Sequence, residues 1–148
     1  MSNCIFCKIA ARKADAFVVA ESENTISFLD VFPKAVGHSL IVPKKHFESL
    51  WEMPAKVRSE LFDEASRAGP AIMNATGAKG LDLIQHHWPF VPELKLKKAH
   101  VHVHLIPRDK NDAIFRNPSV RLEPTQTEMQ VITEKIRTEL SLAQTKLI

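Results

Sequence analysis

The stretch Ala99-His100-Val101-His102-Val103-His104-Leu105-Ile106-Pro107 decides the fold of this chain. Its histidines recur at every second position and alternate with apolar, mostly β-branched residues, which is the pattern of a β-strand. Side chains two residues apart share a face of a strand, with Cα atoms roughly 6.6 Å apart between neighbours. We therefore expect one face to carry the histidines and the other to pack into a core through Val101, Val103 and Leu105. Pro107 should end the strand, because proline cannot continue a sheet ladder.

A half-exposed strand with incidental polar residues is the simpler interpretation of this pattern. Solvent-facing strand positions more often carry Thr, Lys, Glu or Ser than histidine. Three histidines in phase therefore favour a functional site over an ordinary exposed face.

Bulk composition limits the class of protein. The chain has 148 residues, which suits one domain spanning 1–148. Its 45% hydrophobic and 25% charged residues are ordinary for a soluble globular protein. A formal charge of +3 is too small, and its basic residues too scattered, to indicate nucleic-acid binding, although it suits an anionic small substrate. No apolar run reaches the ~20 residues that span a membrane, and the N-terminus lacks a secretory signal, so we expect a cytoplasmic protein with reduced cysteines.

Cys4 and Cys7 form a Cys-x-x-Cys pair at the start of the sequence. A redox pair is expected beside a βαβ pattern and at the start of a helix, and neither is evident from the residues. A zinc half-site needs two further ligands. The sequence contains no other cysteine, so a metal would have to recruit histidines. Spacing alone leaves both possibilities open.

The remaining pattern predicts an α+β fold, with about five mostly antiparallel strands, one central helix and a C-terminal helix. The other strands are expected at 16–20, 25–30, 38–43 and 81–85, and the first two form a hairpin. A helix is expected over 54–75, with a kink or break at Gly69-Pro70. A Thr-x-x-Glu capping box at Thr125 and Glu128 predicts the start of the last helix. His86 and His87 begin a long polar excursion, and we expect them in a turn or on the surface.

Three in-phase histidines have two common uses. They ligate one metal, or they act on a phosphoryl group as nucleophile and anion holders. The first and third histidines are roughly 13 Å apart along a strand, which strains a shared metal site. For phosphoryl chemistry, an imidazole nitrogen is a competent nucleophile when a fixed acceptor holds the proton on the other nitrogen. His102 is the natural nucleophile, because it alone has a histidine on each side.

The sequence resembles the histidine-triad (HIT) family of nucleotide hydrolases and transferases. The stretch 100–106 is similar to the family's His-φ-His-φ-His-φ-φ signature, and 37–46 to its Gly-His-x-Leu-Val-Ile-Pro-Lys-x-His strand. Residues 28–30 resemble its nucleoside-contacting segment, and 4–9 its zinc-knuckle opening. These four motifs occur in the family's order and cover roughly residues 4–110.

The resemblance implies a role for each matching residue. His102 would attack the α-phosphorus of a nucleotide and form a nucleotidyl-histidine that water then hydrolyses. His104 and His38 would complete the catalytic constellation around the phosphate. Asp30 would accept hydrogen bonds from the ribose hydroxyls, with Leu29 and Val31 lining the base pocket.

The same resemblance implies a cofactor and an assembly. A structural zinc ion would be held by Cys4, Cys7, His46 and His100, and a divalent metal could accompany a polyphosphate substrate. The expected substrate is a nucleoside phosphoramidate or a mono- or dinucleoside polyphosphate. Family members pair as two-fold dimers, so we expect a homodimer through the helix that begins near residue 54 and the strand after it.

The chain departs from the family just before the histidine strand. Members there carry Gly-Gln-Ser-Val or Gly-Gln-Thr-Val, whose polar side chains hold phosphate oxygens or the leaving group, whereas this chain has Lys95-Leu96-Lys97-Lys98. Lys98 is in phase with the histidines, and we expect it to reach the distal phosphates, although a solvated basic loop is an equal alternative. Gln85 is the nearest candidate for an asparagine that members carry on the preceding strand. A non-catalytic nucleotide-binding scaffold and a zinc hydrolase remain alternatives.

Overall fold

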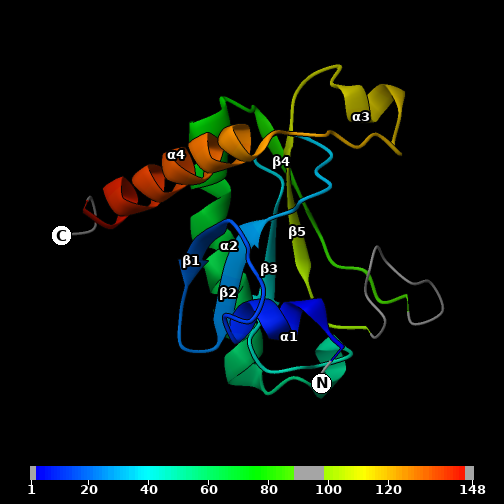
Figure 1. The fold of residues 1–148 in the computed structure, drawn as a ribbon, viewed down its shortest axis with the longest axis vertical. Helices are drawn as coiled ribbons and strands as arrows, with labels where there is room; N and C mark the ends of the chain where they lie inside the picture. Colours follow the sequence, from blue (N-terminus) through cyan, green and yellow to red (C-terminus); the bar gives the residue numbers. More distant parts are fainter. Residues whose placement is uncertain (1–2, 89–98, 146–148) are drawn as a thin grey trace.

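The computed structural model describes residues 3–88 and 99–145. They form a five-stranded antiparallel sheet with strand order β1-β2-β3-β5-β4 and helices on both faces (Figure 1). The strands are β1 (Val18–Glu21), β2 (Thr25–Leu29), β3 (Ser39–Pro43), β4 (Gly80–Ile84) and β5 (Val103–Arg108). The helices are α1 (Ile5–Ala10), the 3₁₀ turn η1 (Leu50–Glu52), α2 (Ala55–Thr76), α3 (Ala113–Arg116) and α4 (Gln126–Thr145). The predicted fold class is confirmed.

Helices α2 and α4 cover one face of the sheet and enclose the larger core. Alternation along the strands sends Ile41, Val103 and Leu105 to this face, and each is completely buried. Helix α2 continues through Gly69-Pro70, so the predicted break is absent. Gly69 lies against β4, where an added Cβ would stand 3.2 Å from the Leu81 side chain. Packing against the sheet therefore holds this helix together although proline removes one of its hydrogen bonds.

Helix α1 covers the opposite face and forms the smaller core. Phe6 and Ile9 pack there with the alternate side chains of β2 and β3, namely Ile26, Phe28, Leu40 and Val42. Cys4 is the residue that precedes the first turn, so the cysteine pair does lie at the start of a helix, contrary to the sequence interpretation. Six residues are too few to show helical periodicity, which is why the sequence did not reveal α1.

Strand β5 differs from its prediction at both ends. It begins at Val103, so His100 and His102 precede it, and it continues through Pro107 to Arg108. The pairing of β5 with β3 ends at Leu105, and beyond that residue β5 pairs with β4 alone. A residue without an N–H is tolerated at position 107 for this reason. The burial of Val101, Val103 and Leu105 in the core is confirmed.

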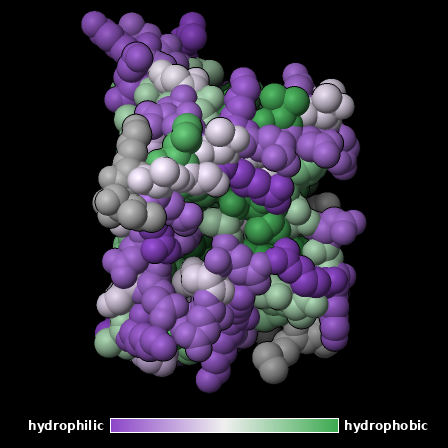
Figure 2. Space-filling model, turned by 90° about the vertical axis from the view of Figure 1, so that its left-hand side faces the viewer, coloured by the Kyte–Doolittle hydropathy of each residue, from purple (hydrophilic) through white to green (hydrophobic). Residues whose placement is uncertain are grey.

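The last helix begins as the capping box predicts. The Thr125 backbone N–H donates to the Glu128 carboxylate at 2.7 Å, and the Glu128 backbone N–H donates to the Thr125 hydroxyl at 3.2 Å. Ile132 and Ile136 anchor α4 on the core. Within the described part of the chain, no helix combines the length and apolar character that crossing a membrane requires. On the face shown in Figure 2, hydrophilic residues predominate and hydrophobic residues are visible in a hollow near the middle.

Candidate functional site

Two cysteine and two histidine side chains lie close together where α1 approaches the segment before β5. Cys4 Sγ lies 3.2 Å from His100 Nδ1, and Cys7 Sγ lies 3.3 Å from His46 Nδ1. The two Nδ1 atoms are 3.1 Å apart, and the ligand atoms of all four residues lie within 4.8 Å of one another. The structure thus brings together the four residues that the resemblance implies as zinc ligands.

The chemistry of this Cys₂His₂ set fits a tetrahedral zinc ion. His100 Nε2 lies 2.9 Å from the Pro43 carbonyl oxygen, so Nε2–H donates there and the lone pair on Nδ1 faces the thiols. Burial lowers the pKa of His100 to about 4, which keeps the ring neutral. Burial and the neighbouring Cys4 raise the pKa of Cys7 to about 11, so without a metal the thiol stays protonated near neutral pH. A bound cation would reverse that preference.

The middle histidine of the triad has a defined tautomer. His102 Nδ1 lies 2.8 Å from the backbone carbonyl oxygen of His100, and only an N–H can satisfy that acceptor. The lone pair of the neutral ring is therefore on Nε2. Phe6 of α1 contacts the His102 ring at a centroid distance of 5.3 Å, and the ring itself is buried.

A second polar cluster joins the end of β2, the start of β3 and β5. His38 Nε2 lies 3.0 Å from His104 Nδ1 and 3.6 Å from an Asp30 carboxylate oxygen. The Lys34 backbone N–H donates to His38 Nδ1 at 3.1 Å, which places the proton of neutral His38 on Nε2. His38 then donates to His104 Nδ1, so the proton of neutral His104 is on Nε2. Burial, with the positive charges of Arg121 and Lys34, lowers the pKa of His38 to about 3.

The two clusters divide the triad between them. His100 belongs to the cysteine cluster and His104 to the Asp30–His38 cluster. Among the described residues, no group of closely spaced ligand atoms includes all three triad histidines. This arrangement disfavours a zinc hydrolase that uses the triad as its metal ligands.

A small apolar cavity of about 110 Å³ lies between α1 and the end of β2. Leu29 and Val31 line it, as the resemblance implies, and Asp30 stands between them. Leu29 is buried, whereas Val31 is 57% exposed and forms part of the rim. Helix α1 supplies the residues of the opposite wall that the sequence did not assign, namely Ile5, Phe6 and Ile9. An apolar cleft with a carboxylate at one end suits a nucleoside, whose base is flat and whose ribose carries hydroxyls.

A polar cavity of about 370 Å³ opens beside His104. Its wall contains Lys34, Arg121 and His86, none of which the sequence assigned to a site. His86 is half-buried, and its ring centroid lies 5.9 Å from that of His104. Gln85, the suggested replacement for the family asparagine, instead donates its amide to the His86 carbonyl at 2.6 Å. His86 and Trp88 are thus the described residues after β4 that line this cavity, while the predicted contact of Lys98 falls outside the described residues.

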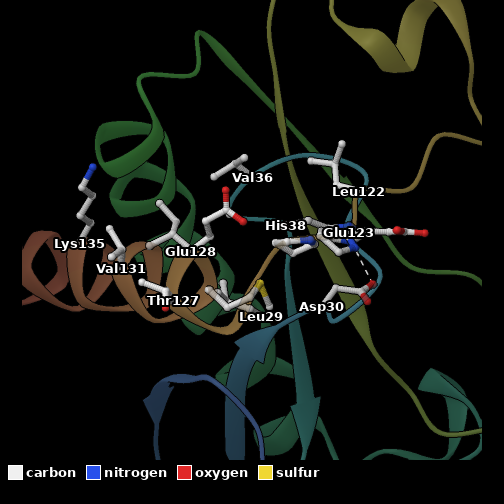
Figure 3. A pocket seen from close by; sticks show the side chains of 15 residues that line it. Leu29, Asp30, Val36, His38, Leu122, Glu123, Thr127, Glu128, Val131 and Lys135 are labelled. Atoms are coloured by element: carbon white, nitrogen blue, oxygen red, sulfur yellow. Dashed lines mark ion pairs between the residues drawn. The ribbon is translucent and has the colours of Figure 1, made fainter.

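A third cavity, of about 480 Å³, lies on the α4 side of the Asp30–His38 pair (Figure 3). Thr127, Glu128, Val131 and Lys135 of α4 face it in Figure 3, opposite Leu29 and Val36. Asp30 lines all three cavities. This carboxylate therefore stands at the junction of the apolar cleft, the polar cavity beside His104 and the space under α4.

Several known proteins resemble this chain in sequence. An adenylylsulfatase, HINT3, from Arabidopsis thaliana is 30% identical over 120 residues, which cover 81% of this chain but only 59% of the relative. An adenosine 5′-monophosphoramidase, HNT1, from Candida albicans is 29% identical over 145 residues, or 95% of this chain and 93% of the relative.

Solved structures agree with the sequence relatives. A hypothetical histidine triad nucleotide-binding protein from Sulfolobus tokodaii superposes with a TM-score of 0.84 at 30% identity, covering 97% of this chain and 95% of the other. A zinc-bound histidine triad family protein from Mycobacterium smegmatis has a TM-score of 0.83 at 24% identity and covers 98% of both chains. The second likeness concerns the fold alone.

The family model for the HIT domain matches residues 11–111, which contain β1 to β5 and every residue of the Asp30–His38–His104 cluster. The chain therefore belongs to the HIT family.

Proposed function

We propose that this protein hydrolyses a nucleotide at its α-phosphorus, with His102 as the nucleophile. The single observation that carries the proposal is the 2.8 Å hydrogen bond from His102 Nδ1–H to the His100 carbonyl oxygen. That bond keeps the lone pair on Nε2 and stabilises the positive charge that the ring acquires when it attacks. The names of the relatives, a phosphoramidase and an adenylylsulfatase, support a hydrolase that acts on nucleotides.

The reaction has two steps in this proposal. His102 Nε2 forms a bond to the α-phosphorus while the bond from phosphorus to the leaving group breaks, and the leaving group departs with that electron pair. Water then attacks the phosphorus, the P–N bond breaks, and the electron pair returns to Nε2. The nucleoside monophosphate takes the water oxygen and is released, so the enzyme ends the cycle unchanged. An amine leaving group also needs a proton, which the Nε2–H of His104 supplies in this proposal, and the attacking water returns a proton to that nitrogen in the second step.

The nucleoside is bound in the cleft between α1 and β2. Leu29 and Val31, with the α1 side chains, contact the base, and Asp30 accepts hydrogen bonds from the ribose hydroxyls. The position of Asp30 beside both the cleft and the His104 cavity supports this placement, because it sets the ribose between base and phosphate. His38 acts on the phosphate through His104, to which it donates at 3.0 Å.

The cysteine cluster has a structural role in this proposal. Cys4, Cys7, His46 and His100 would hold one zinc ion with a closed four-ligand shell, which leaves no position for substrate. Such an ion would fix α1, which forms a wall of the nucleoside cleft, against the segment that carries His100.

The decisive experiment compares His102→Ala with wild type on adenosine 5′-phosphoramidate. We expect the variant to lose at least about a thousandfold in kcat, because nucleophile removal leaves only binding and charge stabilisation. Mass spectrometry of quenched wild-type enzyme should show a nucleotidyl adduct on the peptide that contains residue 102. His87→Ala is the matched control, since His87 is an exposed histidine that lines none of the three cavities described above. Full activity of His102→Ala would rule out the mechanism, and adenosine monophosphate binding without turnover by wild type would favour a scaffold.

A further inference from the structure

Two cationic side chains from distant parts of the chain meet in the cavity beside His104. Lys34 belongs to the loop between β2 and β3, and Arg121 belongs to the segment between α3 and α4. The match to the HIT family model ends at residue 111, so Arg121 lies beyond the residues that this model covers. Neither the triad nor the four matching motifs account for this pair.

The fold holds the segment around Arg121 across the loop that contains Lys34. The Leu122 backbone N–H donates to the Pro33 carbonyl at 2.7 Å, and the Lys34 ammonium donates to the Pro118 carbonyl. These bonds lie on both sides of Arg121 and fix its backbone over the cavity. Figure 3 shows that the next two residues of the chain, Leu122 and Glu123, line the cavity under α4 together with His38. Arg121 is therefore positioned by the structure, although its side chain is exposed.

The two cations repel each other. Burial and the charge of Arg121 both lower the pKa of Lys34. Asp82 attracts Lys34, but the Asp82 carboxylate already pairs with Arg108 at 2.5 Å. In residues 3–88 and 99–145, neither Arg121 nor Lys34 forms an ion pair with a carboxylate. Bringing like charges together costs free energy, and a bound anion would recover it.

We propose that Arg121 and Lys34 form the subsite for an oxyanion leaving group, so that the preferred substrates are nucleotides whose α-phosphate carries a sulfate or a phosphate. This inference rests on the proposed function, because it assumes that His102 attacks the α-phosphorus. The selectivity for the leaving group depends on two other residues, Arg121 and Lys34. The cavity borders Asp30 and His104, so a nucleotide with its ribose at Asp30 would direct its leaving group into this space. His86 also lines this cavity and adds a further nitrogen donor or acceptor.

An oxyanion leaving group and an amine leaving group differ in the charge that they carry when they depart. When His102 Nε2 attacks, the bond from the α-phosphorus to the bridging oxygen breaks, and sulfate departs with that electron pair as a dianion that needs no proton. Negative charge accumulates on the leaving oxygen in the transition state, where a guanidinium and an ammonium stabilise it. Ammonia leaves with a proton and no negative charge. Positive charge in this cavity therefore accelerates the release of oxyanions and does little for amines.

Three adenosine substrates that share the nucleoside and α-phosphate test the inference. They are adenosine 5′-phosphoramidate, adenosine 5′-phosphosulfate and adenosine 5′-diphosphate, whose leaving groups are ammonia, sulfate and phosphate. In Arg121→Gln, the ratio of kcat/KM for the phosphosulfate to that for the phosphoramidate should fall about tenfold at low salt. Arg121→Lys should restore part of the ratio, and salt should reduce the wild-type preference because the side chain is exposed. The diphosphate shows whether the subsite accepts phosphate as well as sulfate.

Arg116→Gln is the matched control, because Arg116 is an exposed arginine in the same C-terminal segment and does not line the cavity. Its ratio should equal that of wild type. An unchanged ratio in Arg121→Gln overturns the inference. Inorganic sulfate binding, followed through imidazole NMR signals, separates this failure from failure of the proposed function. If wild type turns over none of the substrates, weaker sulfate binding in Arg121→Gln than in Arg116→Gln still supports the anion subsite, and equal binding overturns it.

Discussion

Backbone groups determine the proton positions of three histidines in this protein. The His100 carbonyl accepts from His102 Nδ1, the Pro43 carbonyl accepts from His100 Nε2, and the Lys34 amide donates to His38 Nδ1. Backbone amides and carbonyls do not titrate, so they select the tautomer of each ring whenever that ring is neutral. The other ring nitrogen of each histidine is then available for a different interaction. His100 faces the thiols, His102 carries a lone pair, and His38 donates to His104.

Burial of neutral His38 predicts how stability depends on pH. Its pKa is lowered from 6.5 to about 3, so the unfolded chain binds more protons than the folded chain between these values. The free energy of unfolding should therefore fall as the pH drops from 6.5 towards 3, and the contribution should be complete above pH 6.5. At 1.36 kcal/mol per pH unit the largest possible effect is about 5 kcal/mol. Chemical denaturation of wild type and His38→Gln between pH 4 and pH 7 measures the difference in slope.

His87→Gln is the control for this measurement, because it removes an exposed histidine and leaves the buried His38 ring in place. Both variants share the general effect of acid on carboxylates, so only the loss of slope in His38→Gln reports on the buried ring. Parallel curves for wild type and His38→Gln would show that folding does not change the proton affinity of His38, which would contradict the prediction.

Helix α1 is a short element that joins the two candidate sites. Its residues contribute Cys7 to the sulfur and nitrogen cluster, Phe6 to the His102 contact, and Ile5 and Ile9 to the nucleoside cleft. A helix of six residues is not stable alone. Its position therefore depends on the small core and on whatever joins the four ligand side chains.

Removing the thiols should release α1. We expect wild type purified without chelators to contain about one zinc per chain, and the Cys4→Ser/Cys7→Ser variant to contain none. Loss of the ion should lower the free energy of unfolding, by about 4 kcal/mol if free zinc is a thousandfold above its dissociation constant. Elemental analysis and chemical denaturation measure the two effects. Lys8→Ser, an exposed change in the same helix, should alter neither. A metal-free wild type at full stability would contradict the zinc assignment.

Local sequence patterns predicted the elements that have a clear period. The strands, the long helix and the capped C-terminal helix follow from alternation, helical spacing and the Thr125–Glu128 pair, with boundaries shifted by a few residues. Helix α1 is too short to show a period, and the continuity of α2 through Pro70 depends on packing that local rules omit.

Some residues of the candidate site could be predicted from the sequence, and others could not. The triad and the cysteine pair stand out because their members are close together in the sequence. Arg121, Lys34 and His86 lie in irregular segments, where lysine, arginine and histidine are ordinary surface residues. Only the pairing of β4 with β5 and the crossing of residues 118–122 over the loop at 31–37 bring them to one cavity.

At the scale of the whole molecule, the five-stranded sheet has two edge strands, β1 and β4. Strand β4 is one edge, and it carries Leu83 with 47% of its surface exposed. Phe62 of α2, the helix before β4, is 41% exposed. Exposed apolar side chains on an edge strand and its neighbouring helix are typical of an interface between subunits. These residues lie in the helix and strand for which the family resemblance implies pairing.

Introducing a charge at this edge should separate the subunits. We expect wild type at micromolar concentration to have about twice the 16.7 kDa mass of one chain by light scattering. Leu83→Glu should bring the mass to that of one chain, because an interface cannot bury an unpaired carboxylate without a large loss of affinity. Leu142→Glu on α4, which is similarly exposed, is the control and should leave the mass unchanged. A monomeric wild type would overturn the prediction.

The sequence distance between the two halves of the cysteine and histidine cluster has a consequence for protein synthesis. Cys4 and His100 are separated by 96 residues, and a ribosome takes roughly 5 to 20 s to add them. During that interval the nascent chain carries Cys4 and Cys7, but the cluster to which they belong still lacks His100. The cluster that joins Cys4 to His100 is thus completed only after residue 100 has been added. A cell that makes this protein must keep both thiols reduced until residue 100 has emerged.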